Sequence, residues 1–244
     1  MRRIFFAVSL CCSVPGSTQL AYSQTAGTAA AKNEQPFFGG QVKTAKEKAL
    51  DDAFVRSSIK AAGNRDLALT ELIERGFEAI AQRDPKTAMK RFNQASLINA
   101  DDYRVYWGFA AATGLEGNFS KSIELFRSAE LLKSDDPHLL CDSGYSLMAS
   151  AMYQIGNNRA KPNDPKMLEM LRDAEAKFQH AATLDKQSAL PHSLQAILAF
   201  YRDDGVRAWQ EVHKAKQLGG EGLDPKFVDD LKKTIPEPSE TASK

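Results

Sequence analysis

Apolar residues along this chain recur three and four positions apart, which is the spacing of one face of an α-helix. The apolar segments are separated by Gly, Pro, Asn and Asp, residues that end helices or cap their first turns. This pattern predicts an all-α protein. The expected helices cover residues 44–63, 65–82, 85–98, 102–115, 118–132, 137–155, 165–184 and 225–234, with a further helical pair within 189–218.

Two successive segments repeat each other at a period of about 34 residues. Each has a small residue, an aromatic residue four positions later and an alanine three positions after that. The residues are Ala88, Phe92 and Ala95 in the first segment, and Ser122, Phe126 and Ala129 in the second. A fixed period of this length predicts a helix–turn–helix repeat, because small side chains let two helices approach closely and the aromatic ring fills the space beside them.

The same register continues toward the C-terminus. The further matches are Ala174, Phe178 and Ala181, and then Ala208, Val212 and Ala215. The third set lies more than one period after the second, so the third repeat contains an insertion, which we expect to form a projecting hairpin. Gly76 and Gly144 also stand at equivalent places, two periods apart. The register therefore predicts about four repeats, over residues 69–102, 103–136, 137–188 and 189–222.

The ends of the repeat region carry their own signals. Thr44 and Glu47 form the pattern of a capping box, so we expect a helix that covers the open face of the first repeat. A last helix from Asp224-Pro225 should shield the other end. The helical domain is then expected over 44–235, between a flexible leader at 24–43 and a disordered tail at 236–244.

The repeats resemble those of the tetratricopeptide repeat superfamily, and the resemblance covers residues 69–222. It implies a right-handed α-solenoid with an N-terminal helix, an insertion in the third repeat and a C-terminal capping helix. The family's frequent proline near the end of each repeat is absent, which puts the helix-end geometry in doubt. The residues at that place are Ala100, Ser134, Lys186 and Gly220.

The resemblance also implies a concave groove lined by the first helix of each repeat. The residues that the family register places there include Ile73, Phe77, Ile80, Trp107, Leu115, Tyr145, Met148 and Tyr201. The Lys and Asn pattern with which some relatives bind a terminal carboxylate is missing, so an apolar helix or extended peptide is the expected ligand. Two alternatives remain open: several of these residues are core, or the leader's own Phe37-Phe38 fills the groove.

The first residues resemble an export signal. A basic start, an apolar stretch from Ile4 to Val14 and small residues before Gln24 predict cleavage after Ser23. The mature protein, which would begin at Gln24, is then expected to be periplasmic or secreted, with no stable membrane insertion. A retained anchor and a lipidated Cys11 or Cys12 are the less favoured alternatives.

Charge and motifs exclude several classes of function. Cleavage would remove Arg2 and Arg3 but none of the 31 acidic residues, so the mature chain would be close to neutral with no basic block, which argues against a nucleic-acid partner. Its lone Cys141 cannot form an intramolecular disulfide and should be buried. The sequence contains no phosphate-binding loop, metalloprotease motif or nucleophile elbow, so we expect no catalytic residues, no metal site and no cofactor.

These features predict an exported, non-enzymatic scaffold or adaptor that binds a protein or peptide in an apolar groove, in cell-envelope assembly or secretion. The alternative is an accessory or metal-handling protein that uses the Met-rich hairpin of the third repeat. Its thioether ligands would be Met148, Met152, Met167 and Met170.

Overall fold

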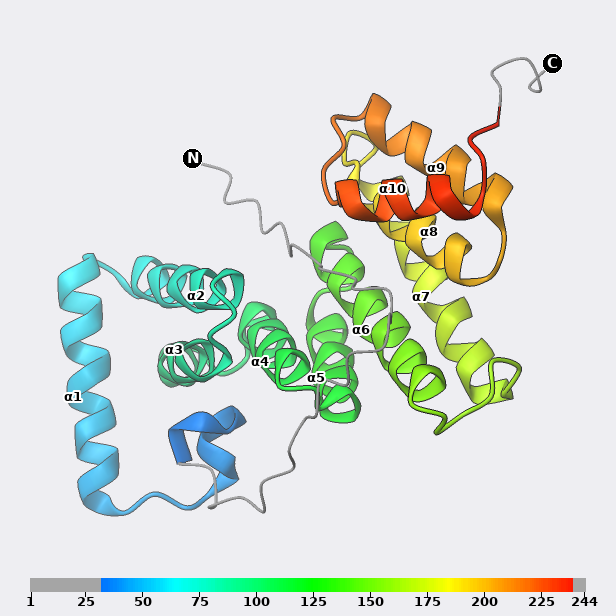
Figure 1. The fold of residues 1–244 in the computed structure, drawn as a ribbon. Coiled ribbons are helices and arrows are strands. Elements are labelled where there is room, and N and C mark those ends of the chain that lie inside the picture. The colour runs from blue at the N-terminus through cyan, green and yellow to red at the C-terminus, as the bar shows by residue number, and fades with distance from the viewer. Residues whose placement is uncertain (1–31, 239–244) are drawn as a thin grey trace. The chain divides into compact units, whose positions relative to one another are not determined.

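The computed structural model describes residues 32–238, and every regular element in this range is helical (Figure 1). The all-α class is therefore confirmed. The expected signal peptide at 1–23 and the leader up to residue 31 lie outside the described residues, as do residues 239–244 of the expected tail. Within the described range, no helix combines the length and apolar character needed to cross a bilayer.

The described residues fall into two compact units, at 32–133 and 134–238. We call them the N-terminal unit and the C-terminal unit and describe each by itself. Each has its own buried apolar core.

Local capping explains where the helices begin. The side chains of Asp84, Asn118 and Asp204 each accept a hydrogen bond from a backbone N–H in the first turn of the helix that follows. Proline occupies the first position of α3, α6, α7 and α10, where no N–H is needed for the helical ladder. The caps of α3 and α5 lie at helix starts that the sequence predicted.

The N-terminal unit consists of two short 3-10 helices, η1 (Lys32–Glu34) and η2 (Pro36–Gly40), followed by five α-helices (Figure 1). These are α1 (Ala45–Ala62), α2 (Arg65–Ala81), α3 (Pro85–Ile98), α4 (Tyr103–Leu115) and α5 (Phe119–Leu132). Helix α2 pairs with α3 and α4 pairs with α5, while α4 also packs against α2 and α3. Helix α1 packs on α2 and α3 but buries none of its residues.

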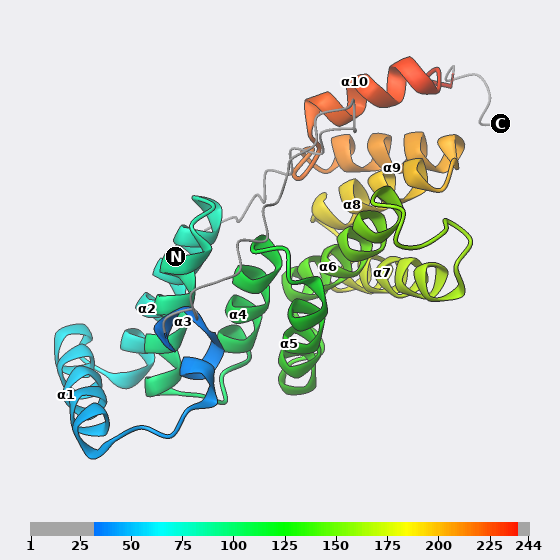
Figure 2. The same cartoon turned by 60° about the horizontal axis from the view of Figure 1, so that its bottom comes forward.

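The C-terminal unit contains α6 (Pro137–Gly156), α7 (Pro165–Leu184), α8 (Leu190–Tyr201), α9 (Gly205–Gln217) and α10 (Pro225–Thr234), which Figure 2 shows from a second direction. Helix α6 pairs with α7 and α8 with α9, and α7 and α8 pack together. Helix α10 buries Phe227, Val228 and Leu231. Its Phe227 ring lies 5.7 Å from that of Phe200 on α8, so α10 covers apolar side chains of this unit.

The small–aromatic–alanine positions of the second helices form the centre of both cores. All twelve of these residues are at most 3% exposed: Ala88, Phe92, Ala95, Ser122, Phe126, Ala129, Ala174, Phe178, Ala181, Ala208, Val212 and Ala215. The Phe92 and Phe178 rings lie against glycines of neighbouring helices. A Cβ atom built on Gly76 would stand 2.6 Å from Phe92, and one on Gly144 would stand 2.6 Å from Phe178.

Helices α6 and α7 carry the inserted residues. Each is 20 residues long, whereas α3, α4 and α5 have 14, 13 and 14. The added turns bury Ala151 on α6 and Met167 and Leu171 on α7, so this helical pair has packing of its own.

Candidate segment-binding site

The eight residues predicted to line a groove are divided between the two units, and most of them are buried. Ile73, Phe77, Ile80 and Trp107 of the N-terminal unit and Met148 of the C-terminal unit are at most 9% exposed. Leu115 and Tyr145 are half-buried, and only Tyr201 is exposed, at 43%.

Packing between first helices explains this burial. The Phe77 ring of α2 lies 4.9 Å from the Trp107 ring of α4 and 5.2 Å from Phe92 of α3. Trp107 also stacks on Tyr103, at 6.5 Å. These rings fill the space between α2 and α4, which is the core alternative that the sequence left open.

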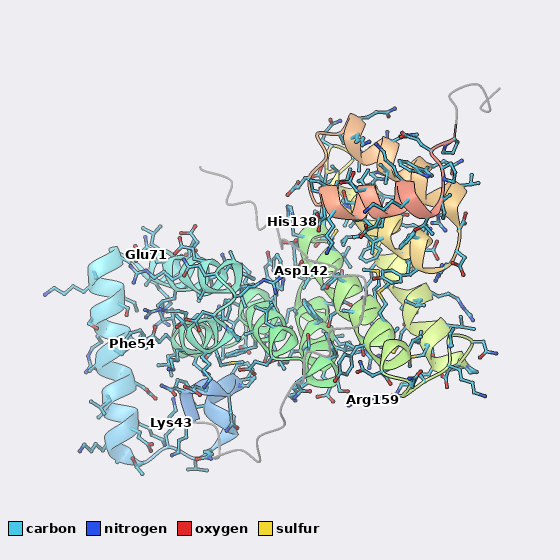
Figure 3. The ribbon with its side chains drawn as sticks, viewed as in Figure 1. Lys43, Phe54, Glu71, His138, Asp142 and Arg159 are labelled. Atoms are coloured by element: carbon cyan, nitrogen blue, oxygen red, sulfur yellow. The ribbon has the colours of Figure 1, made fainter. Side chains whose placement is uncertain are left out.

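The Met-rich hairpin does not present a set of open thioethers. Met148 and Met167 are each 1% exposed, and Met152 and Met170 are half-buried. Cys141 is buried, and burial raises the pKa of its thiol well above the ordinary value. His138, at the exposed start of α6, lies one turn from Asp142 (Figure 3), yet no group of three His, Cys, Asp or Glu side chains within residues 32–238 could hold a metal ion.

A site of a different kind lies on α3 and α4, where residues 32–40 of the chain are bound. The expected flexible leader includes these residues, but here they form η1 and η2 and pack against α3. On α4 the segment contacts Tyr106 and Phe109 through Phe37. Because a helix turns about 100° per residue, these two side chains point about 100° and 200° away from that of Trp107. Residues 32–40 therefore contact a different face of α4 from the one that carries the predicted groove residue Trp107.

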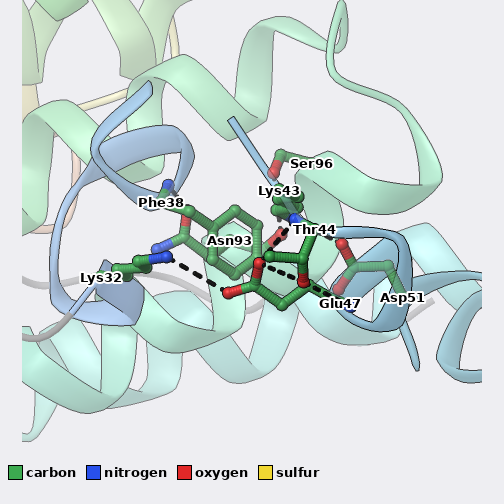
Figure 4. Close-up of polar contacts among 8 residues, drawn as sticks. All are labelled: Lys32, Phe38, Lys43, Thr44, Glu47, Asp51, Asn93 and Ser96. Carbon is green, nitrogen blue, oxygen red and sulfur yellow. Dashed lines mark hydrogen bonds and ion pairs between the residues drawn. The ribbon is translucent and has the colours of Figure 1, made fainter. Parts of the chain in front are cut away.

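Asn93, on α3, forms the polar centre of this site (Figure 4). Its side chain is fully buried, and its Oδ1 accepts a hydrogen bond of 3.0 Å from the N–H of Phe38. Its Nδ2 donates to the carbonyl oxygens of Asn33 and Gln35, at 3.0 and 2.8 Å. All three bonds go to main-chain atoms, so Asn93 recognises the path of the bound segment and not its side chains.

Side-chain contacts surround Asn93. The Glu34 carboxylate lies 3.2 Å from Lys90 Nζ and 3.5 Å from Lys86 Nζ, both on α3. The hydrogen bond from Lys90 is the main cause that lowers the pKa of Glu34. The Phe37 ring lies 5.1 Å from Tyr106 and 4.8 Å from Phe109. An acidic residue and an aromatic residue three positions apart are thus held by two cationic and two aromatic side chains.

The bound segment has an unusual backbone. Phe37 and Phe38 have φ values of 52° and 55°, and Gly39 continues the left-handed turn at 70°. Two consecutive aromatic residues in this conformation are strained, because their Cβ atoms approach the following carbonyl oxygen. Such strain persists only where surrounding contacts enforce it, and here those contacts are the ones made with α3 and α4.

Helix α1 and the segment are joined by ion pairs. Lys32 pairs with Glu47 at 3.2 Å, and Lys43 pairs with Asp51 at 2.5 Å and lies over the Phe38 ring (Figure 4). The backbone N–H of Thr44, its hydroxyl and Lys32 all donate to Glu47, and together they lower its pKa to about 2. A pocket of about 240 Å³ remains between the segment and α1, lined in part by Phe38 and Leu50.

Sequence reasoning placed Phe37-Phe38 in the groove as an alternative but missed Asn93 altogether. One signal was present: Asn93 follows the repeat aromatic Phe92 and stands four positions after Met89, so it lies on the buried side of its helix. A buried polar residue needs hydrogen-bond partners, and its partners come from a segment nearly 60 residues away.

No protein-family model matches the chain. A search of curated proteins likewise found no match. The contacts of the site on α3 and α4 are therefore the basis of the functional proposal.

Proposed function

We propose that this chain is a non-enzymatic scaffold or adaptor that binds a segment of another polypeptide on its helical surface. The proposal includes a right-handed solenoid of about four tetratricopeptide-like repeats. The repeat register and the shared burial of its small–aromatic–alanine positions support it. The proposal also includes export, to the periplasm or out of the cell, and a role in envelope assembly or secretion. These parts rest on the N-terminal residue pattern.

The observation that carries the proposal is the set of bonds made by Asn93. A buried side chain whose three hydrogen bonds all go to the main chain of one short segment is a device for holding polypeptide. Aromatic residues of α4 and a pair of lysines on α3 also contact the bound segment, and these contacts depend on the type of side chain that the segment carries. The surface proposed for binding is thus the α3–α4 face and not the buried aromatic residues between α2 and α4.

Photocrosslinking in the cells that make the protein tests this function. A photoreactive residue replaces Gln94, the half-buried neighbour of Asn93 on α3 whose side chain bonds to Arg91, and in a matched control it replaces the exposed Lys216 on α9. We expect position 94 to form covalent adducts with a discrete set of other polypeptides and position 216 to form none of these. Equal labelling from the two positions, or no adduct from position 94, would contradict the proposal.

A further inference from the structure

We propose that residues 33–38 are an intramolecular ligand, and that the same site binds in trans a polypeptide segment in which an acidic residue precedes an aromatic residue by three positions. This inference rests on the proposed function and specifies its partner. The chain's own Glu34 and Phe37 have that spacing. A partner with this pattern would compete with them for the α3–α4 face.

Two kinds of contact define what the site recognises. Asn93 bonds only to backbone atoms, so it accepts any segment that can follow the same path. The Lys86 and Lys90 ammonium groups favour an acidic side chain, and the ring pair of Tyr106 and Phe109 favours an aromatic one. The fixed distance between these two groups on the surface sets the spacing of three.

Asn93 is better suited to a site that opens than to permanent core. Its side-chain amide bonds to residues 33, 35 and 38, so removal of the segment exposes the amide to water. A hydrated amide carries no desolvation penalty, whereas a permanently covered position is filled better by an apolar side chain. The remaining core around Phe92 is formed by α2, α3 and α4 without the segment.

The bound segment is also weakly anchored. No residue between 32 and 62 is buried, although this stretch includes the whole of α1. Phe37 and Phe38 are held in a left-handed conformation that they leave on release. The segment stays in place chiefly because a short tether gives it an effective concentration on the order of millimolar. A free peptide of equal intrinsic affinity therefore competes poorly until the tethered copy is weakened.

The test opens the site in the full chain and supplies the ligand separately. The double variant Glu34→Gln, Phe37→Ala removes the two side-chain contacts that the tethered segment makes with α3 and α4, and it leaves the sequence of α2–α5 unchanged. The probe is a labelled synthetic peptide of residues 32–43, and fluorescence anisotropy measures its binding. We expect the double variant to bind this peptide on the order of tenfold or more tightly than the unmodified chain does.

Matched variants identify the site. Addition of Asn93→Leu to the double variant should weaken peptide binding on the order of tenfold or more, whereas Gln94→Leu on the same helix should leave it within about twofold. A peptide that itself carries the Gln and Ala replacements should not bind. Absence of binding by a folded double variant would overturn the inference, and so would binding that does not depend on Asn93.

A second measurement uses the unmodified chain, so that the test does not depend on the variants. Millimolar peptide should speed hydrogen exchange at the Phe38 N–H, because the tethered segment loses its bond to Asn93. Unchanged exchange at that amide would overturn the inference. If crosslinking at position 94 succeeds but the peptide does not bind, the protein-binding function stands and only the recognition pattern is wrong.

Discussion

The ring of Phe92 on α3 lies against the backbone of Gly76 on α2, so closely that a Cβ atom on Gly76 would stand 2.6 Å from it. Gly108 on α4 lies against the same ring, since a Cβ atom on it would stand 2.1 Å away. One aromatic side chain thus joins three helices, and the absence of two Cβ atoms makes that possible.

Replacement of Gly76 by alanine should therefore destabilise the N-terminal unit, even though alanine is the better helix former. The added methyl must displace a fully buried ring, and overpacking of this kind commonly costs about 1–3 kcal/mol. Urea denaturation followed by circular dichroism measures the change. Gly156→Ala is the control, since a Cβ on this helical glycine meets no atom within 4 Å. We expect that variant to lose no folding stability. If Gly76→Ala lost no more stability than Gly156→Ala, the result would show that the Phe92 ring can move aside without cost.

Trp107→Ala should behave as a core truncation and not as the loss of a groove residue. Trp107 is 9% exposed and contacts both Phe77 and Tyr103, so its removal should cost about 3–5 kcal/mol of folding free energy. Tyr201→Ala, at an exposed position, should change stability by only about 0.5 kcal/mol. The urea midpoints of the two variants decide the matter. A near-normal midpoint for Trp107→Ala would show that this side chain contributes little to the core, as expected of a groove residue.

Glu175→Gln should destabilise the C-terminal unit. The Glu175 carboxylate on α7 accepts a hydrogen bond of 2.5 Å from Arg202 and also pairs with Arg207, which links α7 to the end of α8 and the start of α9. Desolvation acts to raise its pKa, but the bonds from the two arginines outweigh this effect and the pKa is lowered. We expect a loss of about 1–3 kcal/mol on thermal or urea unfolding. Glu169→Gln, at an exposed position of the same helix, is the control and should be nearly neutral.

Acid should release the contacts between the bound segment and α1. Because the pKa of Glu47 is lowered to about 2, its stabilising bonds are complete above the unfolded value of about 4.3 and disappear as the pH falls toward 2. The pKa of Glu34 is also lowered, so its ion pairs with Lys86 and Lys90 of α3 are likewise lost as the pH falls. A carboxyl titration of Glu47 by nuclear magnetic resonance should have its midpoint near pH 2. In Glu47→Gln the decline of the urea midpoint between about pH 5 and pH 3 should be shallower. A Glu47 midpoint near 4.3 would mean that these bonds do not form in solution.

The sequence determined the local features of this protein. Asp84 before Pro85 predicted a helix over 85–98, and α3 has these bounds, because a cap and an N-terminal proline act within one helical turn. The repeated small and aromatic positions predicted buried contacts at Phe92, Phe126 and Phe178, and all three rings are buried, since close helix packing requires those residue sizes.

Only the tertiary structure decided which surface is core and which is available for binding. The helical register placed Phe77 and Trp107 on first helices, but their burial depends on the distance between α2 and α4, which no local pattern specifies. The site at Asn93 depends on a meeting of α3 with a short segment, nearly 60 residues earlier, that has no helical periodicity of its own. Capping and periodicity act between residues a few positions apart, whereas hydrogen bonds and ion pairs between distant segments form only after the chain has brought those segments together.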